Sequence, residues 1–249
     1  MKALRMEFFK CRRRRLWLPL GIMLAAQLAY LFYTMRDMTA KELSQGWAML
    51  FYYLPYLNAM LMPVFAAITA SRLADLEHKG QTLKLLETVQ TPSALFHAKL
   101  LCGAAHFTLF LVLQLLAATG FGVMRGFGGD VPTDRIAVYF CAAWLTTVGI
   151  FLLQLVLSLL IPNQMIGMII GLAGAFVGLF SLFFPPSFQK FLIWAYYAVL
   201  YNTRMDWDAA TRISDYYFCD VDLSGLLCLA LYILAIYLVG RARFVKKEV

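Results

Sequence analysis

A stretch of mixed charge between residues 71 and 99 offers chemistry in an otherwise apolar chain. Apolar residues recur there at three- and seven-residue steps, which predicts a helix with one apolar face. Such a helix can dock into a partner protein or rest on lipid headgroups, and both interpretations stay open. The apolar positions are Leu73, Leu76, Leu83, Leu86 and Val89, and the charged ones are Arg72, Asp75, Glu77, Lys79, Lys84 and Glu87.

The sequence contains no motif typical of an enzyme. It lacks His-Glu-x-x-His, Gly-x-Ser-x-Gly and Gly-x-x-x-x-Gly-Lys-Ser/Thr, so the chain is not expected to cradle nucleotide phosphates. The spacing of its cysteines and histidines does not suggest a metal site. We therefore expect no catalytic residue, cofactor or metal in this chain. The cysteines are Cys11, Cys102, Cys141, Cys219 and Cys228.

Uncharged polar residues lie within the long apolar runs. They can line a substrate path or hydrogen-bond neighbouring helices, and hydrogen bonding is the interpretation we favour. No charged residue lies deep within a run, which argues against a carrier coupled to protons or ions. The residues are Gln27, Asn58, His106, Gln114 and Gln154.

The elements that carry these residues are membrane spans. Of the 249 residues, 62% are hydrophobic and 14% are charged, and residues 136–189 contain no Asp, Glu, Lys or Arg. This excludes a water-soluble enzyme, a disordered chain and a disulfide-rich secreted module. We predict an all-α integral membrane protein, residues 1–249 forming a single domain, with six spans. The spans are 16–34, 47–70, 100–124, 136–161, 165–184 and 223–240.

The distribution of basic residues predicts the orientation of the spans. One side of the membrane receives both termini and residues 71–99, with 15 Lys and Arg and five acids. The other side receives seven Lys and Arg and nine acids. The first side therefore carries a net charge of +10 and the second −2. By the positive-inside rule both termini are cytoplasmic. This segregation also argues against nucleic acid as the partner of a chain with net charge +8.

Four smaller features complete the prediction. Residues 1–15 are either an amphipathic helix on the inner leaflet or an orientation signal for the first span. Thr91 and Pro92 predict a helix start.

The aromatic segment 188–201, within the outer connection 185–222, is too short to cross and predicts a re-entrant or interfacial piece. The fifth span carries glycines at four-residue steps, which predicts close helix packing, or a mobile seam. These are Gly167, Gly171, Gly174 and Gly178.

The layout resembles ABC-2-type permeases, and within them the small permeases of lantibiotic-immunity and bacitracin-type peptide exporters. The likeness is carried by the basic segment 1–15, by the outer aromatic piece and by the loop after the second span, in which residues 77–99 are motif-like. The loop contains the run from Asp75 to Leu86 (Asp-Leu-Glu-His-Lys-Gly-Gln-Thr-Leu-Lys-Leu-Leu), then Thr91-Pro92 and Lys99. Lys99 stands where the third span begins.

The resemblance implies a permease driven by a separate P-loop ATPase. Residues 71–99 would be the cytoplasmic coupling loop, with Glu77 at its bend, and residues 1–15 the connecting helix. Two ATPase copies, which bind ATP and Mg, would pair with two permeases, identical or sister chains, in a bacterial cell membrane. The cargo would be a cationic antimicrobial peptide. The residues expected to contact the ATPase are Glu77, His78, Lys79, Lys84 and Glu87.

Two other functions stay open at this point. The chain could belong to an ABC-2-type exporter of a drug, lipid or other small molecule. It could also be a membrane protein that sequesters or senses a peptide without transporting it. The outer aspartates could bind a cation or cationic peptide, although a solvated face is the commoner explanation. They are Asp206, Asp208, Asp215, Asp220 and Asp222.

Overall fold

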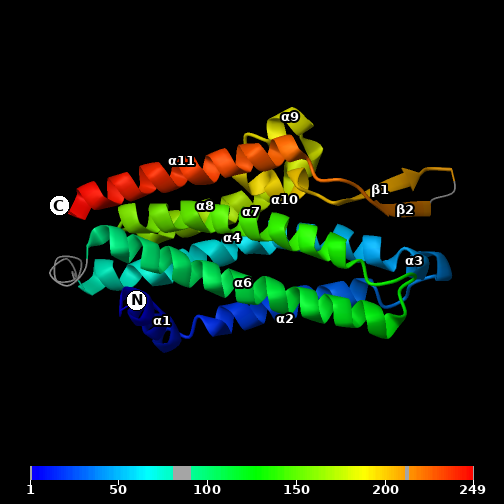
Figure 1. Ribbon diagram of the computed structural model, residues 1–249, viewed down its shortest axis with the longest axis horizontal. Coiled ribbons are helices and arrows are strands. Elements are labelled where there is room, and N and C mark those ends of the chain that lie inside the picture. The colour runs from blue at the N-terminus through cyan, green and yellow to red at the C-terminus, as the bar shows by residue number, and fades with distance from the viewer. Residues whose placement is uncertain (1, 81–90, 211–212, 249) are drawn as a thin grey trace.

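The computed structural model describes residues 2–80, 91–210 and 213–248 (Figure 1). Within these ranges, six helices are long and apolar enough to cross a membrane. They are α2 (Trp17–Thr34), α4 (Gly46–Gly80), α6 (Pro92–Arg125), α7 (Thr133–Leu160), α8 (Gln164–Phe180, continued by the 3₁₀ turn η1, Ser181–Phe183) and α11 (Leu223–Glu248). The prediction of an all-α membrane protein with six spans is confirmed.

Two of the spans begin or end well outside the bounds expected from apolar length. Helix α4 does not stop where the apolar run ends near Ala70 but continues to Gly80. Buried Leu73 and Ala74 extend its packed face into the charged stretch, so the helix has a reason to continue. Helix α6 begins at Pro92, and the side-chain oxygen of Thr91 accepts a hydrogen bond from the amide of Ala94 (3.3 Å). This confirms the predicted helix start.

Helix α4 is the central element of the bundle. About 67% of its apolar, membrane-crossing stretch is buried, against 17% of the corresponding stretches of α2 and α11. It packs against α7 and α8 most extensively, and also against α2 and α6, while α11 packs mainly against α7. Buried aromatic rings fill the middle, where Phe65 meets Phe107 at 5.2 Å between ring centroids and Phe107 meets Phe151 at 5.1 Å. Helices α2 and α11 therefore present most of their surface outward.

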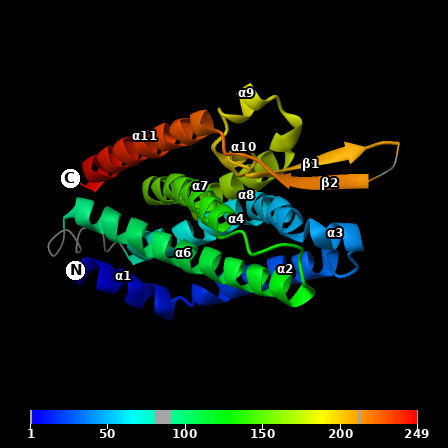
Figure 2. The ribbon, with the colours of Figure 1, turned by 45° about the vertical axis from the view of Figure 1, so that its right-hand side comes forward.

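Both termini lie at one end of the bundle, together with the last turns of α4 and the first turns of α6 (Figures 1 and 2). We call this the terminal end. The short helix α1 (Lys2–Arg13) lies there, against α6 and α4. At the opposite end, which we call the hairpin end, lie α3 (Ala40–Ser44) and two strands, β1 (Thr203–Asp208) and β2 (Ile213–Phe218).

The strands are a feature that the sequence analysis did not predict. They pair antiparallel, from Thr203 opposite Phe218 to Asp208 opposite Ile213. The chain reaches them through three short pieces, α9 (Pro186–Gln189), η2 (Ile193–Ala195) and α10 (Tyr196–Val199). Trp194 in η2 folds back against Gly174 and Gly178 of α8. Since Gly174 lies six residues before the end of α8, the segment turns back along that helix by about 9 Å.

Candidate functional site

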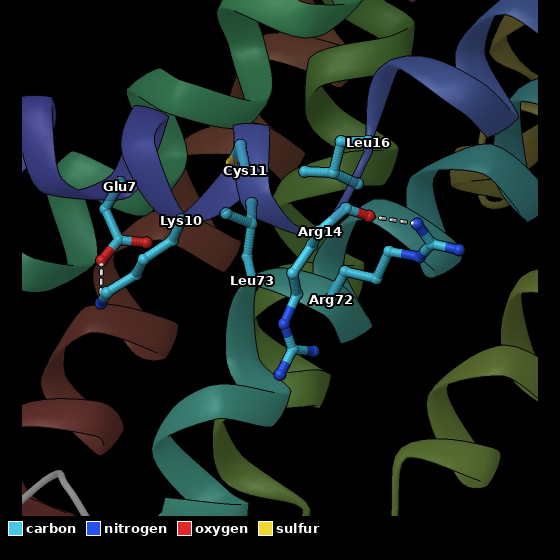
Figure 3. A pocket seen from close by; sticks show the side chains of 7 residues that line it. All are labelled: Glu7, Lys10, Cys11, Arg14, Leu16, Arg72 and Leu73. Carbon is cyan, nitrogen blue, oxygen red and sulfur yellow. Dashed lines mark hydrogen bonds and ion pairs between the residues drawn. The ribbon is translucent and has the colours of Figure 1, made fainter.

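Helix α1 meets α4 and α6 in a seam at the terminal end (Figure 3). The ammonium of Lys99 on α6 lies 3.1 Å from one carboxylate oxygen of Glu7, and that of Lys10 lies 2.6 Å from the other. Lys99 also donates to the carbonyl oxygen of Leu73 (2.6 Å), which links α1, α6 and α4. The side chains of Lys99 and Glu7 are 0% and 2% exposed. A buried charge pair of this kind is tolerated because each charge has several partners.

A second set of contacts continues the seam toward α2. The guanidinium of Arg14 lies 2.8 Å from the carboxylate of Asp75, and Arg72 donates to the carbonyl oxygen of Arg14 (2.9 Å). The side chains of Cys11, Leu16 and Leu73, all buried, line the same small pocket as these charged groups (Figure 3). Helix α1 is thus fastened to α4 and α6 by charge and by packing.

The expected ATPase-coupling residues lie next to this seam in the chain. Glu77, His78 and Lys79 belong to the last turns of α4, a few residues beyond Arg72, Leu73 and Asp75. Lys84 and Glu87 lie outside the described residues. The described part of the expected coupling loop is therefore a direct extension of the second span.

The pairing of Glu7 with Lys99 is not predicted by the sequence. Lys99 was expected at the start of a span, with no charge deep within any span, whereas the structure buries this cation completely. One signal was available: Glu7 is the only acid among the first 36 residues. Cys11 stands four positions after Glu7, so the two side chains lie on the same, buried face of α1. An isolated acid on the same helix face as a small apolar residue is a pattern from which burial with a cation could have been predicted.

Three of the polar residues within the spans form one hydrogen-bonded network with Tyr139. The amide of Gln27 on α2 donates to the side-chain oxygen of Asn58 on α4 (3.2 Å). Gln114 on α6 donates to Gln27 (2.5 Å) and Asn58 (2.9 Å), and Asn58 donates to Tyr139 on α7 (2.7 Å). All four residues are buried. For these residues the prediction of interhelical hydrogen bonding is confirmed.

The four glycines of α8 face neighbouring elements of the same chain. A Cβ at Gly171 would lie 2.5 Å from the Cβ of Ala67 and 3.0 Å from the carbonyl oxygen of Pro63, both on α4. At Gly174 and Gly178 it would meet Trp194, and at Gly167 it would lie 3.4 Å from the hydroxyl of Ser158. Their close contacts lie within one subunit.

A cavity of about 540 Å³ opens near the hairpin end. Tyrosines and charged residues of both signs line it, together with apolar side chains that include Leu182, Phe184 and Val199. The Asp222 carboxylate lies 2.7 Å from the ammonium of Lys190, and this hydrogen bond, with another from Ser224, holds the pKa of Asp222 far below its ordinary value. The polar lining includes Tyr52, Tyr56, Lys190, Tyr201, Arg204, Asp206, Tyr217, Asp220 and Asp222.

The structure also brings together three potential metal ligands that are distant in the sequence. The sulfurs of Cys11 and Cys102 lie 3.2 Å apart, and ligand atoms of these two residues and of His106 all lie within 4.8 Å of one another. The prediction of no metal site rested on spacing along the chain, which carried no sign of this contact between α1 and α6.

A family model for ABC-2 family transporter proteins matches residues 3–178. The chain belongs to the ABC-2 transporter family. It is therefore a multi-pass permease subunit of an ABC exporter, the membrane transport component that works with an ATP-binding subunit. The match runs from α1 into α8, so the seam at the terminal end lies within it, whereas the hairpin and α11 of this ABC-2 permease lie beyond it. No curated protein matches the chain.

Proposed function

We propose that this permease exports a cationic amphipathic peptide from a bacterial cell membrane, as in lantibiotic immunity or antimicrobial-peptide resistance. The charge asymmetry of the chain supports a cytoplasmic terminal end, with net charges of +10 and −2 on the two sides. The hairpin end then faces outward, where such a peptide would be released.

The continuity of α4 is the observation that supports export driven by a separate ATPase. This helix runs without interruption from the buried centre of the bundle to Gly80, inside the stretch that resembles a coupling loop. The same stretch is bound, through Asp75, to Arg14, the residue that directly follows α1. Because an α-helix transmits displacement along its axis, a push on residues 71–89 by an ATPase would move the core of the bundle and α1 together.

The assembly that we propose contains two copies of an ATPase, which bind ATP and Mg, and a second permease, identical or a sister chain. Two outward-facing helices, α2 and α11, leave apolar surface for lipid or for that second permease. Their exposed residues include Ile22, Tyr30, Leu227 and Leu231.

The outer cavity supports the choice of cargo. Its aspartates can attract cationic side chains, and its tyrosines offer aromatic faces on which cations and apolar groups pack. A cavity of about 540 Å³ is large enough for part of a peptide. A lipid or a small hydrophobic drug would need fewer carboxylates.

The coupling role is tested by co-purification. We expect a soluble ATPase to co-purify with the wild-type permease and to be lost in Glu77→Ala and in Lys84→Glu. Asp130→Ala, an exposed acid at the hairpin end, is the matched control and should retain the ATPase. Unchanged binding in both coupling variants would refute the docking role.

The cargo is tested by protection of cells. We expect Asp206→Asn combined with Asp220→Asn to lower the protective effect against a cationic peptide about tenfold, with Asp130→Asn unchanged. If the double variant and the Asp130→Asn control resist a neutral drug equally well, the loss concerns the peptide and not export in general. Protection that persists when the partner ATPase cannot hydrolyse ATP would instead indicate sequestration or sensing.

A further inference from the structure

Two thiols and an imidazole converge where α1 crosses α6. Cys102 and His106 stand four residues apart on α6, so both project from the same face of that helix. Cys11 approaches from α1, and its sulfur lies 3.2 Å from that of Cys102. Cys11 and Cys102 are 4% and 0% exposed. The three ligand atoms lie within 4.8 Å of one another, which is the scale of a metal coordination sphere.

The histidine is held in the manner of a metal ligand. Its Nδ1 donates to the carbonyl oxygen of Cys102 (2.7 Å), which leaves the lone pair on Nε2. In metal sites a carbonyl partner of this kind fixes the tautomer and the orientation of the imidazole. The ring of Phe8 stacks on the imidazole at 5.9 Å between centroids, which adds a second restraint from α1.

Two cationic side chains lie close to the cluster along the helices. The ammonium groups of Lys99 and Lys10 both contact the carboxylate of Glu7, which stands four residues before Cys11 on α1. A thiolate is the form of cysteine that binds metals.

We propose that Cys11, Cys102 and His106 form a binding site for a thiophilic d¹⁰ metal ion, Zn²⁺ or Cu⁺, that ties α1 to α6. Two sulfurs and one imidazole are the donor set that such ions prefer over Mg²⁺ or Ca²⁺. Binding displaces one proton from each thiol to water, so the two thiolates offset the charge of a divalent ion. A tetrahedral Zn²⁺ holds its sulfurs about 3.8 Å apart, which a separation of the helices by about 0.6 Å would provide.

The ion would act on the seam that fastens α1. Glu7 and Lys99 lie within one turn of Cys11 and Cys102 along their helices, so metal binding and this ion pair would restrain the same contact. The site is independent of the cargo and of ATPase docking, and its test requires neither.

The experiment uses the full-length purified permease, reduced and freed of metal with a chelator. Zn²⁺ and Cu⁺ are titrated separately against a competing chromophoric chelator, and Co²⁺ serves as the spectroscopic probe for thiolate coordination. The variants are Cys102→Ser and His106→Asn. The matched controls are Cys228→Ser and His97→Asn, which alter a cysteine and a histidine outside the cluster.

We expect one equivalent of Zn²⁺ or Cu⁺ per chain, a thiolate-to-cobalt charge-transfer band, and a rise in Tm of about 5 °C at saturation. Affinity should fall at least tenfold in Cys102→Ser and His106→Asn and stay unchanged in both controls. His106→Asn tests the site without altering the buried sulfurs. The proposal is overturned by binding below one equivalent, by equal binding in the variants and controls, or by isolation of the permease with Cys11 and Cys102 joined as a disulfide.

Discussion

The buried ion pair of Glu7 and Lys99 shows how a single residue can decide where a whole helix lies. Glu7 sits among seven basic residues in the first 15, and its position alone suggests neutralisation by its neighbours. Lys10 does contact it, but the buried partner is Lys99, which comes from another helix. Burial makes this pairing specific, because a buried charge without a partner is far more costly than an exposed one.

Removing one member of this pair should destabilise the permease strongly. We expect Lys99→Met to lower the free energy of unfolding by about 3–5 kcal/mol, since Glu7 would lose its buried partner. The double variant Glu7→Gln with Lys99→Met should recover much of the loss. Unfolding in detergent measures both. Asp37→Asn, which breaks an exposed pair with Arg36, should change stability by less than about 1 kcal/mol. A Lys99→Met loss no larger than that of the control would contradict the assignment.

At the scale of elements, α8 and α4 approach closely because glycines stand at their contact. A side chain at Gly171 would meet both a Cβ and a backbone carbonyl of α4, neither of which can rotate away. Gln154 of α7 reaches the same point: its amide, oriented to donate to the carbonyl of Gly167 (3.0 Å), also accepts from the amide of Gly171 (3.1 Å). The glycine seam is therefore a junction of three helices.

Replacing a glycine by alanine at this junction should show that steric overpacking outweighs the gain in helix propensity. We expect Gly171→Ala to lower the free energy of unfolding by about 1–3 kcal/mol through overpacking against Ala67 and Pro63. Gly21→Ala in α2 has open space around its Cβ and should be neutral or stabilising by up to about 1 kcal/mol. Thermal unfolding of the two variants side by side makes the comparison. Equal behaviour would mean that α8 moves freely away from α4.

The hairpin is held to α3 and the start of α4 by charged and polar contacts. Lys41 pairs with the carboxylate of Asp215, and Gln45 both donates to Asp215 (3.0 Å) and accepts from the amide of Tyr216 (3.0 Å). The hydrogen bond from Lys41, followed by that from Gln45, lowers the pKa of Asp215 below its ordinary value of 3.8.

This anchoring should depend on pH in one direction. A carboxyl whose pKa is lowered by folding contributes stability above pH 3.8 and loses it as the pH falls further through the folded-state pKa. We expect the amides of β1 and β2 to lose hydrogen-exchange protection, corrected for intrinsic rates, as the pH falls below about 4. Asp215→Asn should weaken protection at neutral pH and flatten the response. Protection that stays constant down to pH 2 in the wild type would argue that packing alone holds the hairpin.

At the scale of the whole molecule, α4 connects the proposed ATPase contact to the core. Its proline positions, Pro55 and Pro63, lie in the buried half, while the stretch beyond Ala70 continues as regular helix. Because no proline follows Pro63 in α4, residues 71–80 are joined by uninterrupted regular helix to the buried residues Phe65 and Ala66 at the centre of the bundle.

A break in α4 should uncouple binding from transport. We expect Ser71→Pro, which removes a helix hydrogen bond and kinks the chain, to retain the co-purified ATPase but to lose at least tenfold of the peptide-stimulated ATP hydrolysis. Ser71→Ala is the control and should behave as wild type. Peptide-stimulated ATP hydrolysis at the wild-type level in Ser71→Pro would show that α4 does not transmit the movement of the ATPase to the bundle.

The amino-acid sequence determined the number of spans, the start of α6 at Pro92 with Thr91 as its N-cap, and the segregation of charge between the two ends. These properties depend on sums over neighbouring residues, since transfer of a segment into lipid requires apolar length and a satisfied backbone. Only the tertiary structure decided that Glu7 meets Lys99, that Cys11 meets Cys102 and that a hairpin rests on Gln45. Each of these contacts joins residues more than 90 positions apart, and which helix faces which is set by packing and by the pairing of buried polar groups, for which no local pattern exists.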